Sequence, residues 1–247
     1  MAVLEGNSHQ REWGLSALLI VQTVTLFVVI PFGENYFAAH LVIDICRLAF
    51  AAVCITVLTH HRWLQATLLL FLVVLIGGPI IGRNLISHLG IEDETAFLHG
   101  LIRLIAFVFT SAVTAIVARH VFGPGRVTFH RVQGAVLIYL NAAALFAIAF
   151  SVIVSWWPEA ITLAGTPLGA KDSEQTALLT YFSLSTLTTT GYGDVVPVHP
   201  IARSLANLEA VIGQLFPATL LARIVALNLE HAKMPGKSRQ ASGDKSD

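Results

Sequence analysis

Long apolar runs constrain this sequence more than any other feature. A bilayer-spanning helix needs roughly 20 consecutive apolar residues, and the 247-residue chain contains several runs of that order. Only 12% of its residues are charged and 55% are hydrophobic, too little charge to cover a soluble domain of this size. We therefore predict an all-α membrane protein with six transmembrane helices. The expected spans are Leu15–Pro31, Leu41–Thr59, Trp63–Ile81, Phe97–Val121, Val132–Trp157 and Ala202–Leu229.

The distribution of basic residues predicts the orientation in the membrane. Lys and Arg mark cytoplasmic loops, and they follow the second and fourth runs and recur in the C-terminal tail. We therefore expect a multi-pass protein of the cell membrane with both termini cytoplasmic and the segment between the last two runs outside. The first run is not followed by a small-residue cleavage site, which favours a retained helix over a signal peptide. The basic residues concerned are Arg62, Arg119, Arg126, Arg131, Lys233, Lys237, Arg239 and Lys245.

A semi-polar run, Thr176–Thr186, lies between the last two spans and is too short to cross a bilayer. Asp172 or Ser173 can cap it as a helix. Non-helical backbone is tolerated at membrane depth only inside protein or along a water-filled cavity, so we expect a re-entrant helix and loop. The negative C-terminal end of this helix favours a cation beyond it. Gly191 and Gly193 permit φ > 0, and alternating handedness would turn successive carbonyls the same way.

The loop after this helix reads Thr189-Thr190-Gly191-Tyr192-Gly193-Asp194. It resembles the selectivity filter of tetrameric potassium channels, usually Thr-Val-Gly-Tyr-Gly-Asp, and the similarity extends over residues 181–197. The resemblance implies passive conduction of K⁺ through stacked rings of backbone oxygens, with no other cofactor and no enzymatic reaction. Thr190 replaces the usual Val, and selectivity should survive because that residue's carbonyl contacts the ion. The expected ion-binding residues are Thr189, Thr190, Gly191, Tyr192 and Gly193, with K⁺ at the first four.

The resemblance also assigns residues that support the filter. In the family, the residues at Tyr181 and Asp194 brace the filter from behind by hydrogen bonding, so we expect the same pair here. We expect Ser185 to support the filter together with this pair, although it stands where some relatives carry Glu. Serine cannot repeat a carboxylate interaction with Asp194 at full strength, which leaves the stability of the conducting filter open.

The last predicted span, Ala202–Leu229, is longer than the hydrocarbon core requires, so it should tilt or extend into the cytoplasm. Gly213 and Pro217 lie near its middle and weaken the helix, so we predict a gating hinge there. The family's inner helix carries a glycine at the same distance from the filter; close helix packing is the alternative role of Gly213. Glu209 should meet a neighbouring helix rather than the ion. The residues expected to line the cavity are Gln214, Pro217, Leu221 and Val225.

The first four spans occupy the place of a voltage sensor but lack its charges. The fourth span carries Arg103 deep inside and Arg119 at its cytoplasmic end, with no basic residue at the third positions between them. A single charge gives only about 2.3 kcal/mol per 100 mV, so we expect weak voltage dependence. Asp44 and Arg47 can meet on one helical face, and structural pairing, including with Arg103, is favoured over a functional role. Cys46 and Cys54 should be apolar packing residues.

One filter motif per chain implies that four chains close a ring around one ion path, a homotetramer in membrane lipid. We divide the chain into a four-helix N-terminal membrane domain (1–131), a pore domain (132–230) and a disordered cytoplasmic tail (231–247). Zero net charge suggests no nucleic-acid partner. The alternatives are a weakly selective or sodium-passing channel, a secondary transporter and a non-conducting regulatory subunit. Enzyme motifs such as His-Glu-x-x-His are absent from the sequence.

Overall fold

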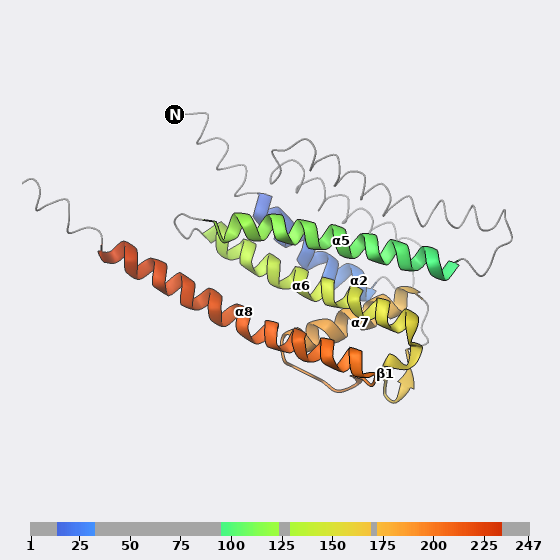
Figure 1. Ribbon diagram of the computed structural model, residues 1–247. Helices are drawn as coiled ribbons and strands as arrows, with labels where there is room; N and C mark the ends of the chain where they lie inside the picture. The colour runs from blue at the N-terminus through green and yellow to red at the C-terminus, as the bar shows by residue number, and fades with distance from the viewer. Residues whose placement is uncertain (1–13, 33–94, 124–128, 169–171, 234–247) are drawn as a thin grey trace, which may run out of the picture.

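A computed structural model describes residues 14–32, 95–123, 129–168 and 172–233, and these residues form a mostly helical fold (Figure 1). A first helix, Gly14–Val29, ends in the π-helical turn η1 (Thr25–Val29) and is followed by α2 (Ile30–Phe32). The long helices are α5 (Thr95–Val121), α6 (Phe129–Trp156) and α8 (Pro200–Lys233). The shorter elements are η4 (Pro158–Ala160), β1 (Ile161–Leu163), β2 (Thr166–Pro167), α7 (Asp172–Leu187) and β3 (Val195–Pro197).

Three of the described helices are long and apolar enough to cross a membrane. They contain the segments Gly100–Arg119, Phe129–Trp156 and Pro200–Ala226, which confirm the predicted fourth, fifth and sixth spans by length and composition. The first helix falls where the first span is predicted but is shorter than the other three. Several predictions lie outside the described residues: the spans Leu41–Thr59 and Trp63–Ile81, and the side chains of Asp44, Cys46, Arg47 and Cys54.

Helix α6 packs against α5, α7 and α8, which makes it the central helix of the described fold (Figure 1). A buried cluster that includes Leu15, Val113 and Leu137 joins it to α5 and to the first helix. Gly134 of α6 permits the close approach, because a Cβ there would collide with the side chain of Val121. Small residues at helix contacts matter in lipid, where van der Waals packing rather than the hydrophobic effect holds helices together.

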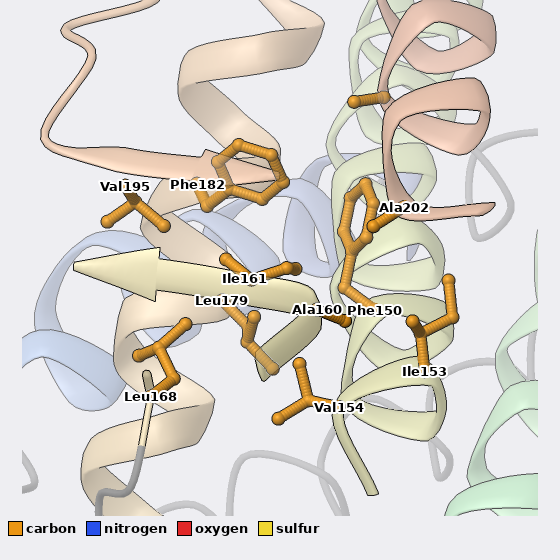
Figure 2. Packing of buried hydrophobic residues seen from close by; sticks show 11 residues of the cluster. Phe150, Ile153, Val154, Ala160, Ile161, Leu168, Leu179, Phe182, Val195 and Ala202 are labelled. Carbon is orange, nitrogen blue, oxygen red and sulfur yellow. The ribbon is translucent and has the colours of Figure 1, made fainter. Parts of the chain in front are cut away.

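A second buried cluster fixes the short helix α7 against the ends of α6 and α8 (Figure 2). Phe150 of α6 meets Phe182 of α7 edge to face, with ring centroids 4.9 Å apart. Ala202 at the start of α8 leaves room for these rings, and Ile161 of β1 closes the cluster (Figure 2). The cluster therefore holds α7 at the end of α6 where α8 begins, as Figure 1 also shows.

A small antiparallel sheet of order β2-β1-β3 departs from the all-helical prediction. β1 and β2 form a hairpin whose turn residues, Ala164 and Gly165, have φ values of 48° and 84°. β3 pairs with β1 through Thr162 opposite Val196, so the chain that leaves the loop after α7 is tied to the hairpin. β-branched residues on both strands favour this pairing. The sheet therefore fixes the C-terminal end of that loop before α8 starts.

Candidate functional site

Helix α7 ends at Leu187, and its last carbonyl oxygen is enclosed by two neighbouring helices. The Tyr139 hydroxyl of α6 donates a hydrogen bond to that oxygen over 3.0 Å. Gly213 of α8 is buried against the same carbonyl, and a Cβ at this position would collide with it. α7 has 16 residues, fewer than the roughly 20 that a span requires. The C-terminal end of a short helix is therefore held firmly between α6 and α8.

The loop that follows α7 has alternating backbone handedness. Thr189, Gly191 and Gly193 have φ values of 57°, 58° and 82°, whereas Thr190 and Tyr192 between them do not have positive φ. The sequence predicts positive φ at the two glycines. It does not predict it at Thr189, because a β-branched residue rarely adopts that conformation. Such alternation is the geometry that lets consecutive carbonyl groups face one side.

Hydrogen bonds from the loop amides to Ser185 of α7 determine the direction in which the loop carbonyls point. The Ser185 carbonyl accepts the Thr190 N–H over 2.9 Å and the Gly191 N–H over 3.2 Å. The Ser185 hydroxyl also lies 3.1 Å from the Gly191 nitrogen and 3.4 Å from the Tyr192 nitrogen, accepting both N–H groups. Across a planar trans peptide, an N–H and the preceding C=O point in opposite directions. The carbonyls of residues 189–191 are therefore directed away from α7.

These carbonyl oxygens have no partner within the described part of the chain. No hydrogen bond among the described residues ends on a backbone oxygen of residues 189–193. The segment is exposed in the single chain, and the Tyr192 side chain is 70% exposed. Backbone carbonyls need partners when they are buried, so an assembly that covers this segment must supply them. A row of outward carbonyl oxygens offers coordination to a dehydrated cation.

Tyr181 and Asp194 meet behind this loop. The Tyr181 hydroxyl donates to Asp194 Oδ2 over 2.9 Å, and the Val195 N–H donates to Oδ1 over 2.9 Å. Desolvation opposes ionisation of the Asp194 carboxyl, but these hydrogen bonds outweigh it and leave its pKa below the ordinary value. Desolvation, followed by the bond to Asp194, raises the pKa of Tyr181. The Tyr181 ring also stacks on Tyr192, with centroids 5.8 Å apart and an interplanar angle of 11°.

Threonine hydroxyls occupy the start of the loop. Thr189 Oγ1 donates to the Thr188 carbonyl over 2.7 Å. Gln214 of α8, which the sequence predicts to line a cavity, donates to Thr189 Oγ1 over a long 3.5 Å. Thr190 Oγ1 lies 2.8 Å from Thr188 Oγ1, so its hydroxyl is used within the loop. The side chain at position 190 therefore faces other side chains, which leaves its carbonyl for a ligand.

Helix α8 continues through both residues of the predicted hinge. Pro217 lies inside the helix, and Gly213 is buried against the end of α7. The close packing of Gly213 supplies a reason for glycine that does not require bending, so the hinge stays a prediction. The other predicted cavity-lining positions, Gln214, Leu221 and Val225, are exposed in the single chain, as is Pro217.

Glu209 faces a neighbouring helix, as the sequence predicts. It is fully buried and hydrogen-bonded to Ser183 of α7. Arg103 of α5 donates to the Ser151 carbonyl of α6 over 3.3 Å and so links these two helices. Sequence reasoning placed Ser185 among the residues that support the loop but missed that its hydroxyl accepts the loop's N–H groups, and it missed Tyr139 altogether. A tyrosine inside the apolar run of α6 was a signal that could have pointed to a buried hydrogen-bond partner.

The geometry is that of a short helix, an oxygen-lined loop and a long apolar helix. Residues 162–230 match a family model described as an ion channel. The chain thus carries an ion-channel domain in a membrane protein. The match begins in β1 and runs through α7 and the loop into α8, so it covers most of the predicted pore domain. No curated protein matches the chain.

Proposed function

We propose that four copies of the chain form a potassium-selective channel that conducts K⁺ passively across the cell membrane, with both termini cytoplasmic. The observation that carries this proposal is the loop backbone: alternating handedness at residues 189–193, amides bound inward by Ser185, and carbonyl oxygens left without partners. An ion loses its hydration shell only where protein oxygens replace it. We call this loop, residues 189–193, the filter.

The geometry of one chain supports an assembly around the ion path, and the resemblance to tetrameric potassium channels supports four copies. A single filter supplies oxygens on one side of an ion, and a closed cyclic assembly is needed to surround it. The exposed apolar face of α8 supports such an assembly, because large uncovered apolar surfaces mark contacts with protein or lipid. Residues on that helix with large exposed apolar side chains are Ile201, Leu208, Val211, Leu215, Leu221 and Val225.

No covalent chemistry is required of the protein, and we assign no enzymatic role and no cofactor other than the permeant ion. The filter contributes backbone oxygens, and Tyr181, Ser185 and Asp194 hold it in place. Potassium rather than sodium is favoured because the carbonyl oxygens of residues 189–191 are directed away from α7, and those of residues 189–193 accept no hydrogen bond in the described structure. Thr190 contributes its carbonyl like any other residue, since its hydroxyl is engaged with Thr188.

The experiment is reconstitution of the purified protein in a planar bilayer, with reversal potentials measured under opposing K⁺ and Na⁺ gradients. We expect the reversal potential to follow the K⁺ gradient. Gly191→Ala should abolish selectivity or conduction, since φ at Gly191 is 58° and an L side chain is strained there. Gly165→Ala is the matched control: φ is 84°, nothing lies within 4 Å of its added Cβ, and it sits in the hairpin outside the filter.

Other outcomes separate the alternatives. A reversal potential that ignores the K⁺ gradient indicates a weakly selective or sodium-passing channel. Uphill movement of an ion driven by a proton or sodium gradient indicates a transporter. A tetramer that binds no ions and carries no current indicates a regulatory subunit. Each of these results would contradict the proposal.

A further inference from the structure

The described helices α6, α7 and α8 meet at one carboxyl group that the filter geometry does not use. Glu209 of α8 is fully buried, with 0% of its side chain exposed. Its Oε1 is hydrogen-bonded to the hydroxyl of Ser183, and its Oε2 has no hydrogen-bond partner in the described structure. A buried carboxylate without a compensating cation or further donors is costly, above all at membrane depth.

Ser183 has one hydroxyl hydrogen but two oxygen neighbours. Its Oγ lies 2.7 Å from the Ala143 carbonyl oxygen of α6 and also contacts Glu209 Oε1. A carbonyl oxygen carries no hydrogen, so the Ser183 hydroxyl must donate to Ala143 for that distance to be a bond. The contact to Glu209 then needs a second hydrogen. In this contact, the group that can supply the second hydrogen is the protonated carboxyl of Glu209.

We propose that Glu209 is a proton-binding site. The bound proton lies between Glu209 and Ser183: the neutral carboxylic acid donates to the Ser183 hydroxyl, which donates to the Ala143 carbonyl. This chain of two hydrogen bonds ties α8 to α7 and α7 to α6. If Glu209 were ionised, the single hydroxyl hydrogen of Ser183 would have to serve both the Ala143 carbonyl and the Glu209 carboxylate. One of these two hydrogen bonds would then be lost.

The surroundings of Glu209 favour the neutral form. From α6, Tyr139 is the titratable group that interacts electrostatically with it, and the Tyr139 hydroxyl is already donated to Leu187. From α7 it meets the uncharged Ser183. Within the described residues, no Lys, Arg or His forms an ion pair with Glu209. Among the residues that the structure describes, no cation offsets a negative charge on Glu209.

The proton site lies close to the support of the filter. Ser183 is two residues before Ser185, whose hydroxyl and carbonyl hold the filter amides. Loss of the proton from Glu209 places a charge against α7 and breaks one of its two links. We therefore expect conduction to fall at alkaline pH. This effect on conduction rests on the proposed function, whereas the proton site itself does not.

The direct test is infrared spectroscopy of the purified, full-length protein in lipid, which separates the C=O stretch of a carboxylic acid from carboxylate bands. At neutral pH, wild type should show a carboxylic-acid band that is lost in Glu209→Gln. The matched control is Glu159→Gln, which changes an exposed glutamate and should retain the band. A wild-type spectrum in which Glu209→Gln removes carboxylate intensity instead would overturn the proposal, whether or not the protein conducts.

A second variant, Ser183→Ala, tests the proton site even if Glu209→Gln misfolds. Ser183→Ala keeps the carboxyl and removes its acceptor, so the carboxylic-acid band should shift to the higher frequency of a weaker hydrogen bond. An unchanged band position would contradict donation to Ser183.

The link to conduction is tested by K⁺ flux from liposomes as pH is raised on both sides. Wild-type flux should fall over the pH range in which the band disappears. Flux through Glu209→Gln should stay flat, because its amide still donates to Ser183 and cannot ionise. A matching pH profile in wild type and Glu209→Gln, or loss of the band without loss of flux, would overturn the link.

Discussion

The hydroxyl oxygen of Ser185 lies 3.1 Å from the backbone nitrogen of Gly191 and accepts its N–H group. The Ser185 side chain thereby holds the filter backbone. The resemblance had suggested a weaker interaction with Asp194 at this position. The Ser185 carbonyl holds the preceding amide as well. The short serine thus reaches the backbone of the loop rather than the carboxylate of Asp194.

Ser185→Ala should destabilise the conducting filter. The change removes the hydroxyl that accepts the Gly191 and Tyr192 N–H groups, while the Ser185 carbonyl still accepts the N–H groups of Thr190 and Gly191. A net loss of about 1 kcal/mol corresponds to a roughly fivefold shift toward non-conducting channels. Macroscopic current should therefore decay faster and recover less. Ser155→Ala is the control, because Ser155 is exposed and its hydroxyl bonds within α6. Equal decay in both variants would contradict the anchoring role.

Tyr181→Phe should shift the acid side of the pH profile. The Tyr181 hydroxyl helps to lower the pKa of Asp194, so the bracing contributes above that pKa and is lost as pH falls through it. Without the hydroxyl the pKa of Asp194 rises, and conduction should begin to fail at a higher external pH. The phenylalanine ring retains the stacking on Tyr192. Current measured against external pH checks this; an identical profile in wild type and variant would refute it.

Gly213→Ala should impair assembly or stability rather than gating alone. The new Cβ would collide with the Leu187 carbonyl, and overpacking of this kind costs about 1–3 kcal/mol. Gly100→Ala is the matched helical control, since nothing lies within 4 Å of its added Cβ, and it should be neutral or stabilising by up to about 1 kcal/mol. Thermal unfolding in detergent compares the two. A Gly213→Ala protein as stable as wild type, but with altered opening, would instead support the hinge.

Thr190→Val should leave selectivity unchanged. It restores the residue usual in potassium-channel filters and removes only the hydroxyl that lies 2.8 Å from Thr188. The carbonyl of residue 190 is unaffected, so the K⁺ over Na⁺ permeability ratio should stay the same while filter stability changes by about 1 kcal/mol. A marked change in that ratio would show that the side chain at 190 acts on the ion. Bi-ionic reversal potentials provide the measurement.

The elements that sequence could predict are those that depend on long periodicities or on special backbone freedom. The apolar runs of α5, α6 and α8 predict their helices closely, and Gly191 and Gly193 predict positive φ where it occurs. The sheet was missed because strands of two or three residues leave no pattern of their own. These strands form because the tertiary structure brings β3 next to the β1–β2 hairpin, and this contact overrides local preference.

Long-range contacts account for the rest of what was missed. Ser185 reaches Gly191 only because the loop folds back over α7, which spacing alone does not reveal. Tyr139 and Leu187 are 48 residues apart, so their hydrogen bond could not be read from the sequence. A hinge and close helix packing were both considered for Gly213, and only the contact with the Leu187 carbonyl shows the packing. Positive φ at Thr189 is imposed by its neighbours against its own preference.

We propose that backbone oxygens of residues 189–193, from four chains, replace water around a permeant cation. The most direct measurement is a structure of the assembled protein in lipid with Rb⁺ or Tl⁺ in place of K⁺, located by their scattering. We expect a fourfold assembly with ion density on its axis, flanked by the carbonyl oxygens of these residues. A monomer, or an assembly whose axis carries no ion and whose carbonyls turn away from it, would show that these oxygens do not bind the ion.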